Sequence, residues 1–142
     1  MTIAAVLKGR EGQVISIGSD ATVAEAIALL AEKRIGALPV IEDDRVVGIF
    51  SERDVIYCLA TQGAEALRKR VAEVMTAPAQ TVEPTRSVLG ALSLMTKRRF
   101  RHLPVLDGDS LVGFVSIGDL VKHRIDKIET EAAAMRDYIQ AV

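Results

Sequence analysis

The chain has 142 residues, of which 49% are hydrophobic, and its formal net charge is −1. This length and composition allow one compact domain, or two intimate half-domains, with a properly buried core. The small net charge gives no electrostatic reason to expect nucleic acid or an anionic membrane surface as the main partner. No apolar stretch approaches membrane-spanning length and the amino terminus lacks a secretion-type pattern, so we expect a soluble cytoplasmic protein.

Cysteine usage limits the chemistry further. Cys58 is the single cysteine, so one chain can form neither an internal disulfide nor a thiolate zinc site. Its neighbours Val55, Ile56 and Leu59 are apolar, which is usual around a buried structural thiol. We therefore expect Cys58 to lie in the core.

The first half of the chain predicts a short lead-in helix, a strand, a helix, two paired strands and another helix. The longer apolar runs have strand character, and the helices show apolar residues at helical spacing. Thr22 can cap the first long helix by accepting the Glu25 N–H. In chain order these elements are expected at residues 2–8, 14–17, 22–34, 37–41, 46–50 and 52–61.

The second half predicts the same order. A polar helical segment over residues 63–75 echoes the lead-in helix, because Val71, Val74 and Met75 repeat the spacing of apolar residues 3, 6 and 7. A strand follows at 80–82, then a helix opened by Ser87. Paired strands are expected at 102–106 and 110–115, and a last helix from about residue 117.

The last helix continues beyond anything in the first half. Its apolar residues keep a helical spacing nearly to the end of the chain, which indicates one apolar face. They are Ile125, Ile128, Ala132, Met135 and Ile139. This face is expected either to contact a second subunit or to cover the core.

The two halves are copies of one unit at an offset of 65 residues. Residues 34–54 and 99–119 align without a gap. The identical pairs are Arg34/Arg99, Leu38/Leu103, Pro39/Pro104, Val40/Val105, Asp44/Asp109, Val47/Val112, Gly48/Gly113, Ser51/Ser116 and Asp54/Asp119. An internal repeat of this kind indicates two supersecondary units that bury their apolar faces against each other.

Each copy contains a strand that ends in Ser-x-x-Asp and turns into a helix. Such a turn can present a hydroxyl, free backbone N–H groups and a carboxylate to one small ligand. The alternative is structural: Ser51 and Ser116 cap their helices, while Asp54 and Asp119 only compensate the helix dipole. The duplication of the motif in the same frame favours the ligand interpretation.

Leu-Pro-Val before each hairpin and Gly-x-x-Ser-x-x-Asp after it resemble the cystathionine-β-synthase-type (CBS) domain, and two in tandem resemble the pair called a Bateman module. The resemblance implies an α/β (α+β) fold in which two β-α-β-β-α repeats pack with pseudo-twofold symmetry around two clefts. It divides the chain into residues 1–63, residues 64–124 and a helical tail, 125–142. It also implies binding of adenosine ligands (AMP, ADP, ATP, sometimes NAD(H) or S-adenosylmethionine) and assembly into disc-shaped homodimers.

Carried over from the family, the motif residues receive roles at the clefts. Asp54 and Asp119 would accept hydrogen bonds from the two ribose hydroxyls, and Ser51 and Ser116 would donate to a phosphate. The adenine is expected against apolar wall near residues 14–16 and 77–81, which include Ile15, Ala77 and Gln80. The residues around Leu-Pro are expected to line the clefts, largely through backbone groups; they are Gly36, Ala37, Leu38, Pro39, Arg101, His102, Leu103 and Pro104.

The two copies differ in charge. Arg53 stands where the second copy has Gly118, and Arg101 stands where the first has Gly36. Arginine suits phosphate oxygens, so our hypothesis is that the basic second copy holds the more phosphorylated ligand. The alternative is that both arginines are solvated surface cations. His102 is interpreted as a hydrogen-bonding wall residue rather than a metal ligand, because no second His or Cys lies at ligand spacing.

No phosphate loop, nucleophile elbow or catalytic cluster is present in the sequence, so we expect no enzymatic activity and no required cofactor. Two functions remain open. The first is a nucleotide sensor that regulates an unknown protein partner in trans. The second is a dimerisation scaffold whose ligand sites have degenerated. A nucleic-acid role for the short basic stretch 97–101 is a distant third.

Overall fold

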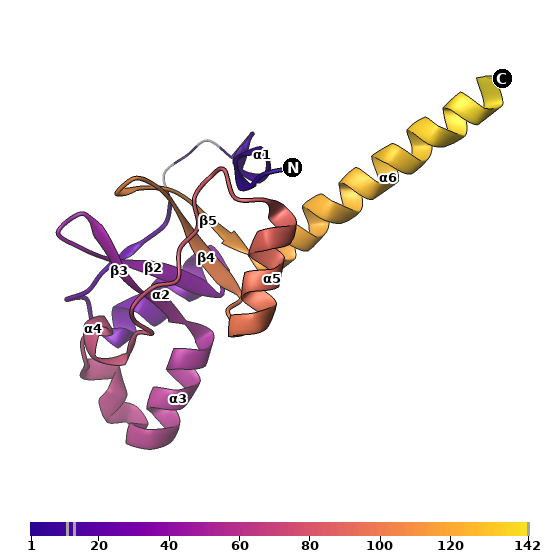
Figure 1. The fold of residues 1–142 in the computed structure, drawn as a ribbon. Helices are drawn as coiled ribbons and strands as arrows, with labels where there is room; N and C mark the ends of the chain where they lie inside the picture. Colours follow the sequence, from indigo (N-terminus) through magenta and orange to yellow (C-terminus); the bar gives the residue numbers. More distant parts are fainter. Residues whose placement is uncertain (11, 13, 142) are drawn as a thin grey trace.

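The computed structural model describes residues 1–10, 12 and 14–141, and it is a mixed α+β structure as the resemblance implies. Figure 1 shows two small sheets with helices around them and a long helix leaving the body of the molecule. The first-copy elements are α1 (Ile3–Leu7), β1 (Ile17–Gly18), α2 (Val23–Lys33), β2 (Ala37–Glu42), β3 (Arg45–Ser51) and α3 (Glu52–Gln62). The remaining elements are the 3-10 helix η1 (Gly63–Arg68), α4 (Val71–Val74), α5 (Val88–Arg98), β4 (His102–Asp107), β5 (Ser110–Ser116) and α6 (Ile117–Ala141).

The two sheets repeat one another. In the first, β1 pairs in parallel with β2, and β2 pairs antiparallel with β3. In the second, β4 pairs antiparallel with β5, and a single parallel bridge from Val82 to Val105 takes the place of β1. Both hairpins have a register shift after the same position of the repeat, Val40 and Val105. The equivalent irregularity shows that the repeat extends to backbone detail.

Three predicted elements differ in extent from the structure. The strand expected at residues 14–17 begins only at Ile17. The strand expected at 80–82 is reduced to the bridge at Val82. The segment 63–75 is a 3-10 turn followed by the four-residue α4 rather than one helix. A short apolar run does not by itself determine where a strand begins and ends. Its extent depends on how many residues find hydrogen-bonding partners in the neighbouring strand.

The two hydrophobic cores exchange their lead-in helices. Ile3 and Val6 of α1 are buried in the core formed by α5, β4, β5 and the start of α6. Val71 of α4 is buried in the core of the first copy. Each short helix thus packs on the copy other than the one that follows it in sequence, and this exchange ties the halves together. The division of the chain into residues 1–63, 64–124 and 125–142 remains a prediction from the sequence repeat.

Gly48 and Gly113 make this exchange possible. A Cβ atom on Gly48 would lie 2.7 Å from Met75 Sδ, and one on Gly113 would lie 2.6 Å from Leu7 Cδ1. Met75 follows α4 and Leu7 ends α1, so the lead-in helix of each half lies directly over the glycine of the opposite strand. The repeated glycine is therefore required by close approach.

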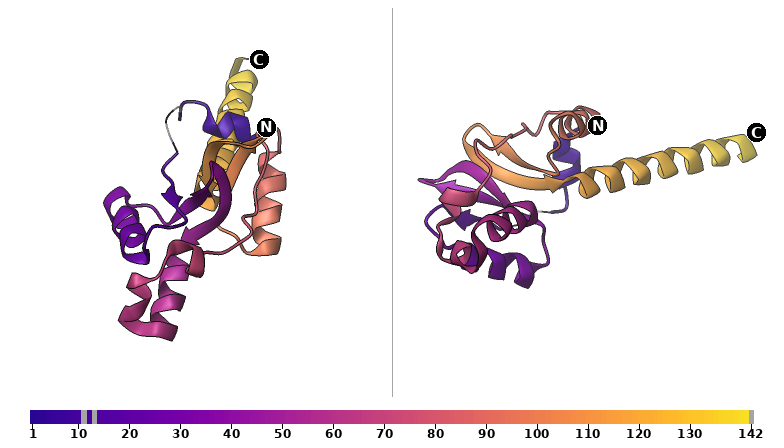
Figure 2. Two further views of the ribbon diagram at one scale, coloured as in Figure 1. Left: turned by 90° about the vertical axis from the view of Figure 1, so that its left-hand side faces the viewer. Right: turned by 90° about the horizontal axis from the view of Figure 1, so that it is seen from below.

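The tail of α6 does not cover either core. Figures 1 and 2 show it running away from the two sheets as a single helix. Among the tail residues expected to face inward, Ile125 and Ile128 are each 49% exposed, and Met135 and Ile139 are 60% and 65% exposed. The expectation of a lid on the core is therefore wrong. Within the described residues, no helix combines the length and apolar character needed to cross a membrane.

Candidate functional site

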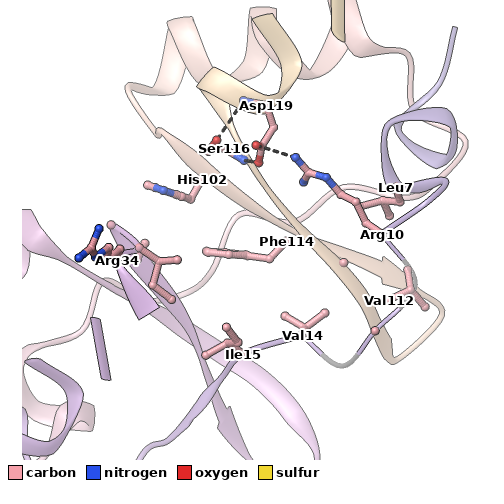
Figure 3. A pocket seen from close by; sticks show the side chains of 15 residues that line it. Leu7, Arg10, Val14, Ile15, Arg34, His102, Val112, Phe114, Ser116 and Asp119 are labelled. Atoms are coloured by element: carbon pink, nitrogen blue, oxygen red, sulfur yellow. Dashed lines mark hydrogen bonds and ion pairs between the residues drawn. The ribbon is translucent and has the colours of Figure 1, made fainter. Parts of the chain in front are cut away.

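Two clefts lie between the halves, and each combines both copies of the repeat. The first, with a volume of about 570 Å³, brings Ser116 and Asp119 of the second copy to Ile15 and residues 34–37 of the first; we name it the Asp119 cleft (Figure 3). The second, of about 740 Å³, brings residues 51–53 of the first copy to 78–80 and 98–102 of the second; we name it the Arg53 cleft. Cavities of this size suit ligands of nucleotide dimensions.

Asp119 is held at the start of α6 by its own turn. Its Oδ2 accepts the Ser116 N–H at 2.8 Å, and its N–H donates to the Ser116 hydroxyl at 3.0 Å. The other oxygen, Oδ1, accepts a hydrogen bond from the Arg10 guanidinium at 2.8 Å. Figure 3 shows Arg10 reaching this carboxylate from the segment that follows α1. Asp119 thus takes part in the cap of α6 and also presents to the cleft a carboxylate that is paired with Arg10.

The electrostatics of this pair follow from its surroundings. Partial burial raises the pKa of Asp119, but the hydrogen bonds from Arg10 and Ser116 outweigh burial and leave that pKa below its ordinary value. The same hydrogen bond raises the pKa of Arg10. The carboxylate is therefore ionised throughout the physiological range.

We expect the Arg10–Asp119 pair to contribute a pH-dependent stability of at most about 1 kcal/mol, because both side chains are partly exposed. Since the pKa of Asp119 is lower in the folded state, the contribution is present above the ordinary value of 3.8 and is lost as the pH falls through the folded pKa. The unfolding free energies of the wild-type protein and Arg10→Ala should therefore converge as the pH falls below the ordinary carboxyl pKa. Arg45→Ala, at the exposed first residue of β3, serves as control. A difference between the wild type and Arg10→Ala that does not change with pH would contradict the assignment.

Asp54, the equivalent carboxylate, has a different environment. It is buried, at 9% exposure, and Oδ2 accepts both the Ser51 N–H at 2.9 Å and the Ser51 hydroxyl at 3.2 Å. Its Oδ1 accepts the Thr76 hydroxyl at 3.0 Å. Asp54 does not line the Arg53 cleft, whereas Ser51 and Arg53 do. Because Asp54 is buried, lies outside the lining of the cleft and accepts these three hydrogen bonds from within the protein, it acts as a structural group in this conformation.

Comparison with known proteins agrees with this duplicated architecture. Residues 11–61 and 71–126 each match the family model of the CBS domain. The chain belongs to the CBS-domain family. The tandem CBS pair and the α+β fold expected from the sequence are thereby confirmed.

Relatives of this CBS pair span most of its length. It is 33% identical over 148 aligned residues to the CBS domain-containing protein CBSX3, mitochondrial, of Arabidopsis thaliana, a match that covers 98% of this chain and 72% of that protein. A solved structure of a protein with CBS domains from Burkholderia ambifaria shares 43% identity at a TM-score of 0.83, covering 89% of this chain and 95% of that one. The crystal structure of CBSX2 in complex with AMP shares 26% identity at a TM-score of 0.73, covering 88% and 96%.

The Arg53 cleft of the CBS pair is strongly basic. Arg53, Arg98, Arg99 and Arg101 line it, with Glu52 as the carboxylate among them. All four arginines are exposed, and within the described part of the chain none of them forms an ion pair. Unpaired guanidinium groups that converge on one cavity favour an anionic ligand, since arginine binds phosphate oxygens in a bidentate manner.

His102 stands in the wall that separates the clefts and lines both of them. Its ring stacks on Phe114, with the centroids 5.5 Å apart and the planes at 13°. Burial lowers the pKa of His102, and Arg101 acts in the same direction although Asp119 and Glu52 raise it. The neutral imidazole is therefore favoured at neutral pH. Gly36 also lines both clefts, and a Cβ there would lie 3.6 Å from His102 Cε1.

The structure brings most of the proposed site residues to the clefts. Those that line one or both are Gly36, Ala37, Ile15, Ser51, Arg53, Gln80, Arg101, His102, Ser116 and Asp119. The side chains of Leu38 and Leu103 lie fully buried in the two cores instead. Pro39 and Pro104 are buried in the strands, and neither they nor Ala77 line either cleft. All four residues of the two Leu-Pro pairs are buried, so the prediction that their side chains line the clefts is wrong, and only the residues immediately before each pair reach a cleft.

Several cleft residues were missed from the sequence. Arg10 is 109 residues from Asp119, so no local pattern joins the two. Arg34 and Phe114 line the Asp119 cleft, and Arg98 and Arg99 line the Arg53 cleft. Arg34 and Arg99 are an identical pair in the repeat, and this identity is the sequence signal from which both could have been proposed as site residues. Among the residues the structure describes, no group of His, Cys, Asp and Glu side chains is placed to hold a metal ion.

Proposed function

We propose that this CBS pair is a non-catalytic regulatory module that binds adenosine nucleotides in its clefts. The observation that carries the proposal is the Asp119 carboxylate beside Ser116 at a helix start, facing a cleft lined by Arg10 and Arg34. The crystal structure of the relative CBSX2 holds AMP, which supports the ligand class. A cytoplasmic location and regulation of a protein partner in trans belong to the same proposal.

The Asp119 cleft provides a place for each part of the ligand. The carboxylate of Asp119 has two acceptor oxygens for the vicinal hydroxyls of ribose. Val14, Ile15 and Phe114 give an apolar wall for the adenine. Ser116 lies where the first turn of α6 exposes N–H groups, a position that favours phosphate.

Arg10 links this ligand to the rest of the molecule. Its guanidinium donates to Oδ1 of Asp119, so a ribose hydroxyl that binds the same oxygen competes with Arg10 and would displace it from its present position. The displaced cation remains at the cleft, where it can approach the phosphate. Because Arg10 follows α1, which is packed in the core of the second copy, nucleotide binding would change the contacts of the lead-in segment. A ligand shifts such an equilibrium only through unequal affinity for the two arrangements.

The test is calorimetric titration of the full chain with AMP, ATP, NADH and S-adenosylmethionine. We expect saturable binding of at least one of them, and a loss of affinity of at least about tenfold in Asp119→Ala, since hydrogen bonds to a charged group contribute about 1.5–3 kcal/mol each. Arg45→Ala, which alters an exposed arginine outside both clefts, should bind as the wild type does. Absence of binding by all four ligands to folded protein would favour the scaffold function instead.

The basic Arg53 cleft leads to a prediction about phosphate number. Arg101→Ala removes one of the four guanidinium groups that line this cleft. It should weaken the binding of ATP more than that of AMP, because ATP carries two more phosphate groups for the arginines to bind. We expect a loss of about tenfold for ATP, from the contribution of one charge-assisted hydrogen bond. Titration of both nucleotides into the wild type and the variant measures it. An unchanged ATP affinity would reject the hypothesis that the basic second copy holds the more phosphorylated ligand.

A further inference from the structure

The exposed apolar residues of α6 form a continuous heptad stripe. Val121, Ile125, Ile128, Ala132, Met135 and Ile139 are separated by alternating steps of four and three residues. This 3.5-residue period is the signature of a coiled-coil seam, with Ile125, Ala132 and Ile139 at a and Val121, Ile128 and Met135 at d. The five large side chains of the stripe are between 42% and 65% exposed. We name this stripe of six apolar side chains, from Val121 to Ile139, the α6 seam.

The helix that carries the seam lacks support within one chain. From Ile128 to Ala141 every residue is exposed except Ala133, and Figure 2 shows this part of α6 extending away from the body in both views. An isolated helix of such length is marginal in water, because packing of an apolar face supplies most helix stability in proteins. A second helix on the seam would provide that packing.

The charges beside the seam indicate which helix fits it. Arg124 and Glu131 occupy g positions, and Glu129 and Arg136 occupy e positions. In a parallel in-register pair, each g residue faces the e residue five positions later on the other helix. Arg124 then faces Glu129, and Glu131 faces Arg136. Twofold symmetry doubles these contacts, so a parallel pair has four attractive pairs at these positions and no repulsive one.

The antiparallel arrangement is less favourable. With full overlap of the two seams it would place Glu129 opposite Glu129 and Glu131 opposite Glu131 of the second copy, and Lys122 near Arg136. A shift of one heptad removes the repulsion but leaves either Val121 and Ile125 or Met135 and Ile139 without a partner in the opposite seam. We propose that the α6 seam pairs with the seam of a second copy of this chain, as a parallel two-stranded coiled coil.

Cysteine cross-linking tests the direction of the pair. In Met135→Cys the new thiols lie at a d position, and a parallel pair brings them together, so oxidation should give a disulfide-linked dimer in high yield. Thr130→Cys, on the opposite side of the helix, is the matched control, and the unaltered chain controls for Cys58, which is buried. If Met135→Cys forms no more cross-linked dimer than Thr130→Cys, the parallel pair is excluded.

Sedimentation equilibrium tests the contacts of the full chain. Ile128→Glu places a charge in the seam and should weaken dimerisation at least tenfold, whereas Thr130→Glu should not. Glu131→Arg sets like charges against Arg136 and should weaken the dimer about tenfold, and the double change Glu131→Arg with Arg136→Glu should restore it. A chain that is monomeric at all concentrations, or a dimer indifferent to Ile128→Glu, would overturn the proposal. Neither result bears on nucleotide binding, because the seam lies outside both clefts.

Discussion

Replacing Asp54 with alanine is expected to lower the free energy of unfolding by about 3 kcal/mol, from the loss of hydrogen bonds to a buried charged group. The carboxylate accepts from the Ser51 N–H, the Ser51 hydroxyl and the Thr76 hydroxyl. The Ser51 bonds close the capping box of α3. The Thr76 bond joins α3 to the segment after α4, so one side chain connects the start of a helix with the exchanged lead-in segment.

Urea denaturation of the wild type and Asp54→Ala measures this effect. The matched control is Asp119→Ala, which removes the same motif residue from the second copy. Asp119 is 28% exposed and Arg10, which pairs with it, is 46% exposed. Loss of this ion pair should therefore lower the free energy of unfolding by about 1 kcal/mol or less, in addition to the loss of the helix cap. Equal losses in the two variants would show that burial and the Thr76 bond do not distinguish the copies.

The repeat explains how much of the fold could be predicted. Nine identical pairs at one offset fix the equivalence of β2–β3 with β4–β5, and both hairpins form with the same register. Thr22, Ser51 and Ser87 cap helices because each is a short hydroxyl side chain before an apolar periodic run, and each accepts the N–H three residues later. These features depend on local sequence, so local sequence was sufficient.

The parts that could not be predicted depend on distant contacts. Nothing local indicates that α1 packs on the second core and α4 on the first. The same exchange brings Arg10 to Asp119 and Thr76 to Asp54. The sequence therefore indicated two equivalent motifs, whereas their partners, Arg10 in one and Thr76 in the other, give them different chemistry.

The different partners of Asp54 and Asp119 bear on the two interpretations of the Ser-x-x-Asp motif, helix capping and ligand binding. The capping geometry is present in both copies, since Ser51 and Ser116 each accept the N–H of their aspartate. Asp54 combines the cap with burial and a hydrogen bond from Thr76, whereas Asp119 combines it with an ion pair to Arg10 in the lining of a cleft. A cap and a ligand group are therefore compatible functions of one residue, and the proposed ribose role rests on Asp119 alone in this conformation.

Gly48→Ala is expected to destabilise the protein by about 3 kcal/mol, the upper end of the usual cost of overpacking. The new methyl group would lie 2.7 Å from Met75 Sδ and 2.8 Å from the Thr76 carbonyl oxygen. Met75 can move its thioether, but the Thr76 carbonyl accepts the Ile49 N–H at 2.9 Å. Relief of the clash must therefore move the backbone that also holds the Thr76 hydroxyl on Asp54.

Thermal and urea denaturation of Gly48→Ala measures the loss, and Gly118→Ala is its control. Gly118 lies in the first turn of α6, where a Cβ would meet only the Ser116 Oγ at 3.7 Å, an ordinary contact. That change should stabilise the helix by about 0.5–1 kcal/mol, because glycine loses more conformational freedom on folding than alanine. A Gly48→Ala variant as stable as the wild type would mean that the segment after α4 can withdraw from β3 without cost. The close contact between the exchanged lead-in segment and the first copy would then not hold the two halves together.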